Sequence, residues 1–198
     1  MLTASIEQLC LRIAESNDEA AFNLLFKSYY PRLLVFAQAI LKTREPAEEA
    51  VEDVFVKLWE NRKVLPAIKK LNYYLLVSVK HRALDYLEKI KSQAVVGLDD
   101  VVFGIDAIQT TNPETSLISA ENIRIIRSAI NELPPRCKLI FHLVKEEGLK
   151  YREPADLLNI SLKTVETQMS LALRKIGEAL QARFPSEAWR SQVNRLGK

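Results

Sequence analysis

Apolar residues keep a helical spacing through two stretches of this chain and lose it between them. Apolar residues recur every three or four positions in residues 18–91 and again in 119–181, which is the period of an amphipathic α-helix. The gap, residues 92–117, holds four acids, two glycines and Pro113 but no Lys or Arg, and we interpret it as a linker. The pattern predicts an all-α protein of two small helical domains joined by a flexible linker.

Turn and cap residues divide the chain further. The predicted segments are a first domain at residues 1–91, an acidic linker at 92–117, a second domain at 118–183 and a tail at 184–198. Asp18 is placed to cap a helix, Pro31 predicts a kink or two abutting helices, and Pro46 marks the start of the next helix. Further helices are expected at 72–91, after a loop that holds Pro66, and at 119–131 and 136–146, where Gly148 ends the last one.

The helix that begins near Pro46 has two sides of opposite character. One side collects the apolar residues Ala47, Val51, Val54, Phe55 and Leu58. The other collects the acids Glu45, Glu48, Glu49, Glu52 and Asp53. Residues 45–60 carry six acids against one Lys, a local net charge of −5 in a chain of net charge +3. Because such acids repel one another, the pattern indicates a surface for a basic partner; a plain solvated face is the alternative.

The helix expected at 72–91 also presents two sides. Its apolar side consists of Leu75, Leu76, Val79, Ala83, Leu87 and Ile90. Its outer side consists of Tyr74, Ser78, His81 and Asp85, flanked by Lys80, Arg82 and Lys89. An aromatic ring, a hydroxyl and an imidazole beside basic residues suit a splayed nucleic-acid strand. A tyrosine that only keeps its polar tip in water at the domain rim is the competing interpretation.

Residues 151–176 fit a helix-turn-helix. Ala155 is small where two helices cross closely, Asn159 falls where the turn needs a left-handed residue, and Ser161 can cap the second helix. The predicted buried stripe of that helix is Val165, Met169, Ala172 and Ile176. The opposite face can reach base edges and phosphates in a major groove, whereas an ordinary helical hairpin with a polar outside is the alternative.

Two blocks of the sequence resemble the extracytoplasmic-function group of the sigma-70 family. The first comprises AAFNLLFKSYYPRLLVFAQAILKTREPAEEAVEDVFVKLWENR and LNYYLLVSVKHRALDYLEKIK, and it is similar to region two. The second, LPPRCKLIFHLVKEEGLKYREPADLLNISLKTVETQMSLALRKIGEAL, is similar to region four. The resemblance implies an alternative sigma factor that binds core RNA polymerase and directs promoter-specific transcription initiation. In that family, region two opens the minus-ten element of the promoter and region four reads the minus-thirty-five element.

The resemblance also implies partners and site residues. The expected partners are the beta-prime coiled coil and beta flap of core RNA polymerase, promoter DNA and an anti-sigma factor. Polymerase binding falls on Glu48, Glu49, Glu52 and Asp53. Minus-ten recognition falls on Lys69, Lys70, Asn72, Tyr74, Ser78, Lys80, His81 and Arg82, with a flipped base read near Lys69, Asn72 and Tyr74. Minus-thirty-five recognition falls on Lys163, Thr164, Glu166, Thr167, Ser170, Arg174 and Lys175. Asp99, Asp100 and Asp106 of the linker are expected to imitate a nucleic-acid backbone in the polymerase cleft, unless the linker is only a tether.

The sequence departs from the family pattern at several positions. Glu52 stands where Gln is common, His81 where Asn is common, and Glu166 where a basic residue is common. Glu153-Pro154-Ala155 replaces Glu-aliphatic-Ala, so the first helix of the helix-turn-helix is expected to start late, near Pro154. Trp59 matches a family tryptophan that we expect to be part of the core.

Other classes of protein are less well supported. Cys10 and Cys137 are far apart and fit neither a disulfide framework nor a zinc site, and Cys10 is expected to be a buried thiol. His81 and His142 have no paired nucleophile, glycine loop or metal spacing, so we expect no enzyme activity, cofactor or metal. No apolar run nears the length of a membrane span or a signal peptide, which predicts a cytoplasmic protein. A dimeric helix-turn-helix regulator would explain residues 151–176 but not the acidic helix.

Overall fold

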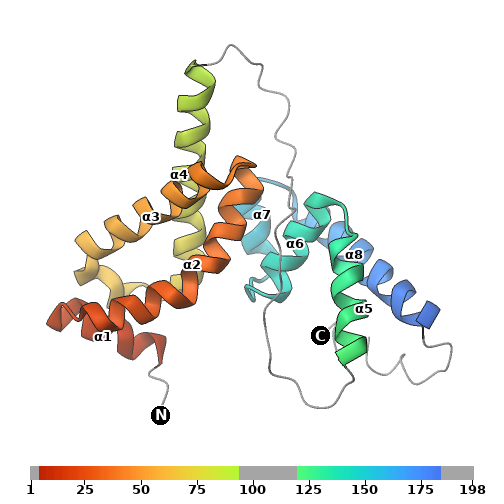
Figure 1. The fold of residues 1–198 in the computed structure, drawn as a ribbon, viewed down its shortest axis with the longest axis horizontal. Coiled ribbons are helices and arrows are strands. Elements are labelled where there is room, and N and C mark those ends of the chain that lie inside the picture. Colours follow the sequence, from red (N-terminus) through yellow and green to blue (C-terminus); the bar gives the residue numbers. More distant parts are fainter. Residues whose placement is uncertain (1–4, 94–119, 184–198) are drawn as a thin grey trace. The chain divides into compact units, whose positions relative to one another are not determined.

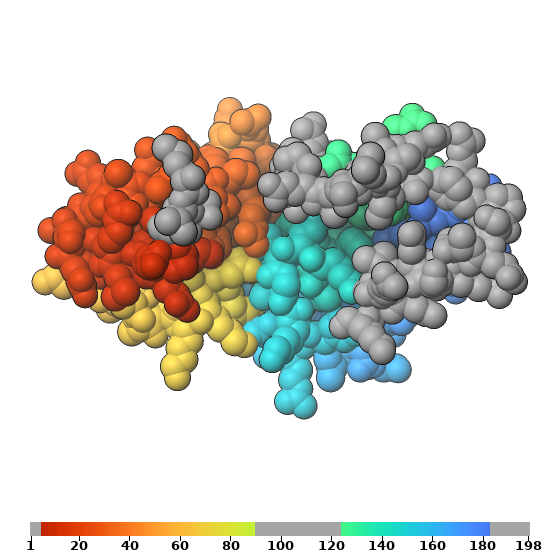
Figure 2. Space-filling model, turned by 90° about the horizontal axis from the view of Figure 1, so that it is seen from below, coloured from red at the N-terminus to blue at the C-terminus, as the bar shows by residue number. Residues whose placement is uncertain are grey.

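A computed structural model describes residues 5–93 and 120–183, and the regular secondary structure in those ranges is all helical. The described residues form two compact units, one in each range (Figure 1). Figure 2 shows one face of the molecule in space-filling form, coloured along the chain. The prediction of an all-α fold is therefore confirmed. The linker acids Asp99, Asp100 and Asp106 lie outside the described residues.

The first unit begins with a helix that the sequence analysis did not predict, α1 (Ile6–Ser16). Ser5 and Gln8 form a capping box at its start, in which each side chain bonds the other residue's backbone N–H. The buried residues Leu9, Cys10 and Ile13 pack the helix against the rest of the unit. The Ser-x-x-Gln spacing was the signal that could have revealed it.

The second helix, α2 (Glu19–Leu41), begins as predicted at Asp18, whose side chain accepts a hydrogen bond from the Ala21 N–H at 2.9 Å. Pro31 lies within this one helix and does not divide it. Figure 1 shows α2 changing direction about halfway along. A proline inside a helix removes one backbone donor and crowds the preceding turn, so of the two alternatives the kinked helix is the one observed.

The remaining elements of the first unit are α3 (Arg44–Glu60), the 3-10 helix η1 (Arg62–Ala67) and α4 (Leu71–Gln93). The predicted apolar side of α3 is buried, together with Ala50. On α4, the predicted residues Leu75, Leu76, Val79 and Ala83 are buried and Leu87 is half-buried, whereas Ile90 lies outside the described side chains. The segment around Pro66 is helical and not a loop, because Leu65 turns into the core at 1% exposure.

Aromatic rings add to the core where α2 meets α3. The Phe22 ring lies edge-on to Trp59 at 5.0 Å between centroids, and the Phe26 ring lies 4.7 Å from Phe55. Such tilted and edge-to-face pairs add to the free energy of burial. The guanidinium of Arg62 covers the outer face of Trp59 at 4.8 Å. Half-buried Trp59 is thus part of the packing, as predicted.

The second unit contains α5 (Ala120–Asn131), α6 (Pro135–Lys145), α7 (Arg152–Leu158) and α8 (Leu162–Arg183). Its core is built from Ala129, Ile130, Leu133, Cys137, Ile140, Phe141, Ala155, Val165, Met169, Ala172 and Ile176. Gly148, which follows α6, has φ +68°. This left-handed conformation favours glycine and ends the helix as predicted.

The helix-turn-helix is formed by α7 and α8. Asn159 has φ 53° between the two helices, and the Ser161 hydroxyl accepts a hydrogen bond from the Thr164 N–H at 3.0 Å. The expected late start of the first helix is wrong, because α7 begins at Arg152 and Pro154 lies in its first turn. First-turn N–H groups have no partner within a helix, so a proline there costs no hydrogen bond.

Candidate nucleic-acid and partner interfaces

The acids of α3 form one outward face, which we call the acidic face: Glu45, Glu48, Glu49, Glu52 and Asp53. Glu45, Glu49 and Glu52 are exposed, whereas Glu48 and Asp53 are half-buried. Residues on the opposite side of the helix are in the core, so packing fixes which way the carboxylates point. The structure therefore presents the predicted acids at the surface together.

The carboxylates of the acidic face differ in their surroundings. The Glu48 Oε1 atom accepts a hydrogen bond from Arg44 Nε at 2.7 Å, and this bond raises the pKa of Arg44. Burial, followed by the charges of Glu48 and Glu52, raises the pKa of the neighbouring Tyr30. The acidic face is thus partly neutralised at its N-terminal end, where Arg44 lies. Glu49 and Glu52 are its exposed centre.

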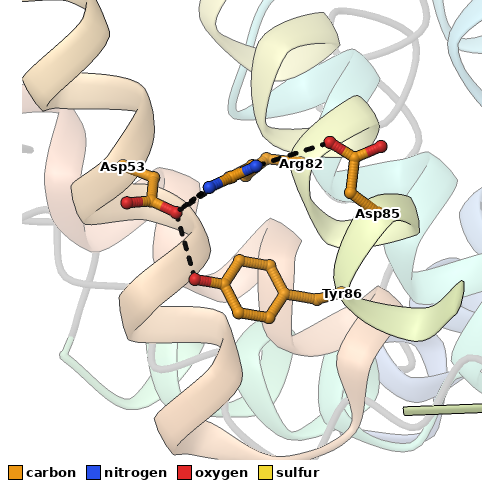
Figure 3. Close-up of polar contacts among 4 residues, drawn as sticks. All are labelled: Asp53, Arg82, Asp85 and Tyr86. Atoms are coloured by element: carbon orange, nitrogen blue, oxygen red, sulfur yellow. Dashed lines mark hydrogen bonds and ion pairs between the residues drawn. The ribbon is translucent and has the colours of Figure 1, made fainter. Parts of the chain in front are cut away.

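Asp53 has a different environment, because it holds α3 to α4 (Figure 3). Its Oδ2 atom accepts hydrogen bonds from Arg82 Nε at 2.8 Å, Arg82 Nη2 at 2.6 Å and the Tyr86 hydroxyl at 3.0 Å. Arg82 Nη1 lies 3.6 Å from an oxygen of Asp85. Side-chain exposure is 25% for Arg82 and 35% for Asp53. We call Asp53, Arg82 and Tyr86 the Asp53 cluster.

The Asp53 cluster shifts the pKa of each of its members. Partial burial alone would raise the pKa of Asp53, but the hydrogen bonds from Arg82 and Tyr86 lower it. The bond to Asp53 raises the pKa of Arg82. Burial, then the hydrogen bond to Asp53 and the nearby carboxylates, raise the pKa of Tyr86 to about 12. The carboxylate stays ionised and the phenol stays protonated at neutral pH, which are the states that the geometry needs.

A cavity of about 250 Å³ lies between α3 and α4. It is lined by Val54, Lys57, Leu58, Asn61, Tyr74, Ser78, His81, Arg82 and Asp85. Four residues predicted for minus-ten recognition, Tyr74, Ser78, His81 and Arg82, therefore meet at one place. Tyr74 is 42% exposed, and the Ser78 hydroxyl donates to the Tyr74 carbonyl at 2.9 Å. An aromatic ring beside polar side chains can stack and bond a nucleic-acid base.

The remaining residues of that predicted set do not line the cavity. Lys69 and Lys70 are exposed just before α4, while Asn72 and Lys80 are half-buried on it. Conversely, the cavity includes Lys57 and Asn61 near the end of α3, which the sequence analysis missed. The residue pattern of α4 could not reveal Lys57 and Asn61, because these two residues belong to the α3 side of the cavity.

The outer face of α8 carries the residues predicted for the upstream promoter element. Lys163, Thr167, Ser170 and Arg174 are exposed, whereas Thr164, Glu166 and Lys175 are half-buried. The predicted stripe Val165, Met169, Ala172 and Ile176 is buried on the reverse. The structure therefore places this predicted set along one helix surface.

Hydrogen bonds orient several of these side chains. The hydroxyls of Thr167 and Ser170 each donate at 2.9 Å to the carbonyl four residues earlier, so each hydroxyl oxygen keeps its lone pairs as acceptors. Thr164 is held in the cap by Ser161 at 2.8 Å between the two hydroxyls. Arg174 Nε lies 3.8 Å from Glu178, with 68% of its side chain exposed. The geometry suits donors and acceptors that contact a groove.

The described residues give no sign of a metal centre. No group of three His, Cys, Asp or Glu residues in 5–93 and 120–183 could hold a metal ion. Cys10 and Cys137 are free and buried, and burial raises the pKa of both thiols. Within the same ranges, none of the helices is long and apolar enough to span a bilayer.

The structure thus describes a helical unit with an acidic face and a polar cavity, and a second unit with a helix-turn-helix, a motif typical of DNA-binding proteins. The sigma-70 region 2 model matches residues 25–93, and the model of sigma-70, region 4 matches residues 123–176. Together they cover more than half of the chain. The chain belongs to the sigma-70 family, whose members are DNA-binding transcription initiation factors and not enzymes.

Curated relatives narrow the group. The chain is 25% identical over 165 residues to the ECF RNA polymerase sigma factor RpoE of Cereibacter sphaeroides, covering 83% of this chain and 88% of the relative. It is 20% identical over 183 residues to the ECF RNA polymerase sigma factor SigK of Mycolicibacterium vanbaalenii, covering 91% of each. A solved structure of CnrH in complex with the cytosolic domain of CnrY is similar with a TM-score of 0.48 and 18% identity, over 90% of this chain and 99% of that one. The chain is an alternative sigma factor of the extracytoplasmic-function group, and it directs transcription initiation.

Proposed function

We propose that the first unit binds core RNA polymerase through the acidic face of α3, with Glu48, Glu49, Glu52 and Asp53 as the contact residues. The observation that carries this proposal is the exposure of Glu49 and Glu52 on a helix whose reverse is wholly core. Neighbouring acids repel in the free protein, so they gain most from a basic partner. The beta-prime coiled coil is the proposed partner, and its attraction to these acids weakens with salt.

The cavity between α3 and α4 is the proposed site for a base of the non-template strand. Tyr74 offers a stacking surface at its rim, and Ser78 and His81 offer hydrogen bonds. Lys69, Lys70, Asn72 and Lys80 lie outside the cavity and are proposed to follow the backbone of the strand. Opening of the minus-ten element would then be driven by capture of bases outside the stack.

The second unit is proposed to read the minus-thirty-five element with α8. Thr167, Ser170 and Arg174 face outward and would contact base edges. Lys163 and Lys175 would contact phosphates, with Thr164 and Glu166 at the edge of the contact. The beta flap of polymerase is the proposed protein partner of this unit.

The proposed domain boundaries are residues 1–91, 92–117, 118–183 and 184–198. The linker is proposed to enter the polymerase cleft, where Asp99, Asp100 and Asp106 would imitate a nucleic-acid backbone. An anti-sigma factor is the proposed regulator, because members of this group are commonly held by one, and the proposed location is the cytoplasm. We expect that this chain needs no bound cofactor to act in transcription initiation.

Reversal of Glu49→Lys with Glu52→Lys tests the docking proposal. Both side chains are exposed, so melting temperature and helicity should be retained. Two lost attractions and two new repulsions should weaken binding to core polymerase by about 2–5 kcal/mol, roughly 30-fold to several-thousand-fold. Run-off transcription should be lost, whereas binding of the full chain to duplex minus-thirty-five DNA should persist.

A matched control reverses two exposed acids of α1, Glu7→Lys with Glu15→Lys. It changes the net charge of the chain equally but leaves the acidic face intact, so polymerase binding should stay near that of the parent. If the Glu49 and Glu52 variant binds core polymerase as tightly as the parent at low salt, the acidic face is only solvated. Polymerase would then have to bind another surface of the chain.

A further inference from the structure

Asp53 takes part in two surfaces at once. On α3 it lies one turn beyond Glu49 and next to Glu52, within the acidic face. All three hydrogen bonds from the Asp53 cluster end on its Oδ2 atom, so the other carboxylate oxygen, Oδ1, points away from Arg82 and Tyr86 (Figure 3). One oxygen thus holds α4 and the other faces away from it.

Arg82 is likewise shared, because it also lines the cavity between α3 and α4. Its Nε and Nη2 atoms donate to Asp53, while Nη1 lies on the side of Asp85, which lines the same cavity. A guanidinium is planar, so the two hydrogen bonds from Nε and Nη2 fix the orientation of the whole group. The position of this wall of the cavity therefore depends on Asp53, which is itself outside the set of residues that line it.

The two charges are coupled strongly enough to act together. Both side chains are more than half covered, so their attraction is screened less than that of a fully exposed pair. Removal of either partner leaves the other charge without its main bond. Tyr86 donates to the same oxygen and further fixes the carboxylate.

We propose that Asp53 is a positioning residue that links polymerase docking to capture of the minus-ten strand, by holding Arg82 and Tyr86 through Oδ2 while Oδ1 faces the docked polymerase. This inference rests on the proposed function of the acidic face and the cavity. Arg82 then serves in promoter opening by shaping the cavity wall together with Asp53. It does not act as an independent phosphate contact. Loss of either residue releases the same wall, so their effects overlap.

A double-mutant cycle separates this role from two independent contacts. Open-complex formation on a duplex promoter is measured by permanganate reactivity of unpaired thymines, at saturating core polymerase, for Asp53→Asn, Arg82→Gln and the double variant. We expect each single substitution to lower the open-complex equilibrium by about tenfold, and the double variant by about the same factor. Independent contacts predict a loss of about a hundredfold in the double variant. Tyr86→Phe, which keeps the ion pair, should lower opening by a smaller factor of about threefold.

The chain offers a matched control in Arg12 and Asp18. Arg12 donates Nε and Nη2 to Asp18 Oδ2 at 2.9 and 2.6 Å, nearly the geometry of Arg82 and Asp53, but at the junction of α1 and α2. Arg12→Gln with Asp18→Asn removes this pair while Asn keeps the helix cap. This double variant should leave promoter opening unchanged. That result is expected even if its melting temperature falls by as much as that of Arg82→Gln.

The outcomes are distinct. Overlapping losses in the Asp53 and Arg82 cycle, without loss in the control, support the positioning role. Additive losses in the double variant overturn the positioning role. A loss of promoter opening that occurs in every variant, the control included, and follows the loss of melting temperature also overturns it. Failure of the docking proposal is detected by a different measurement: the variant with Glu49→Lys and Glu52→Lys would bind core polymerase as tightly as the parent.

Discussion

Truncation of Arg174 to Ala should distinguish base reading by α8 from general attraction to DNA. The Arg174 side chain is 68% exposed, and its Nε atom lies 3.8 Å from Glu178, itself 66% exposed. An exposed ion pair of this kind contributes about 0–1 kcal/mol. The free protein therefore loses little when Arg174 is shortened, and a change in DNA affinity reports mainly on the contact with DNA.

The expected magnitude follows from the donors that Arg174 can offer. A guanidinium that bonds two acceptors of one guanine discriminates against other bases by about 1–3 kcal/mol, or roughly 5- to 150-fold in affinity. The weak ion pair with Glu178 has to be given up, so we expect a value in the lower half of that range. Glu178→Ala should in turn tighten binding slightly, because it frees the guanidinium and removes a negative charge.

The assay measures binding of the full chain to duplex DNA with the minus-thirty-five element and to a scrambled duplex, over a series of salt concentrations. Arg174→Ala should lose affinity mostly on the specific duplex. Lys175→Ala should weaken both duplexes alike and reduce the salt slope by about one. Arg127→Ala, an exposed arginine of α5, is the control for a lost positive charge. Equal losses on both duplexes for Arg174→Ala would refute base reading by this residue.

Two further predictions concern a core residue of the second unit and the Asp53 cluster of the first. Met169 is 1% exposed, so Met169→Ala should destabilise the second unit by about 2–5 kcal/mol in denaturant unfolding; a loss below about 1 kcal/mol would show that α8 packs differently. Tyr86 should titrate at about 12 in an ultraviolet difference titration against Tyr86→Phe, and its pKa should fall toward the ordinary value of about 10 in Asp53→Asn. Because the folded pKa is raised, the contribution of the protonated phenol to stability is complete below about pH 10 and is lost as the pH rises toward 12. An unchanged titration in Asp53→Asn would contradict the hydrogen bond.

The sequence determined the features that depend on neighbouring residues. The helical period predicted the buried side of α3 and the stripe of α8 that includes Val165 and Met169, because spacing alone fixes which residues share a face. Asp18 and Asn159 marked helix ends, since a cap or a left-handed turn needs particular side chains. The same local logic could have revealed α1 from Ser5 and Gln8. It overestimated the effect of Pro154, whose cost depends on its position within the first turn.

Which helix faces meet depends on how the helices pack in three dimensions. Arg82 and Asp53 are 29 residues apart, and Tyr86 and Asp53 are 33 apart, on helices whose separate patterns predicted a nucleic-acid surface and a polymerase surface. The sequence could not show that these side chains bond one another, or that Lys57 joins Tyr74 around one cavity. Helical period fixes the direction of a side chain about its own axis, whereas contacts between helices depend on how their ridges and grooves interlock. That packing turned two predicted surfaces into neighbours that share one carboxylate.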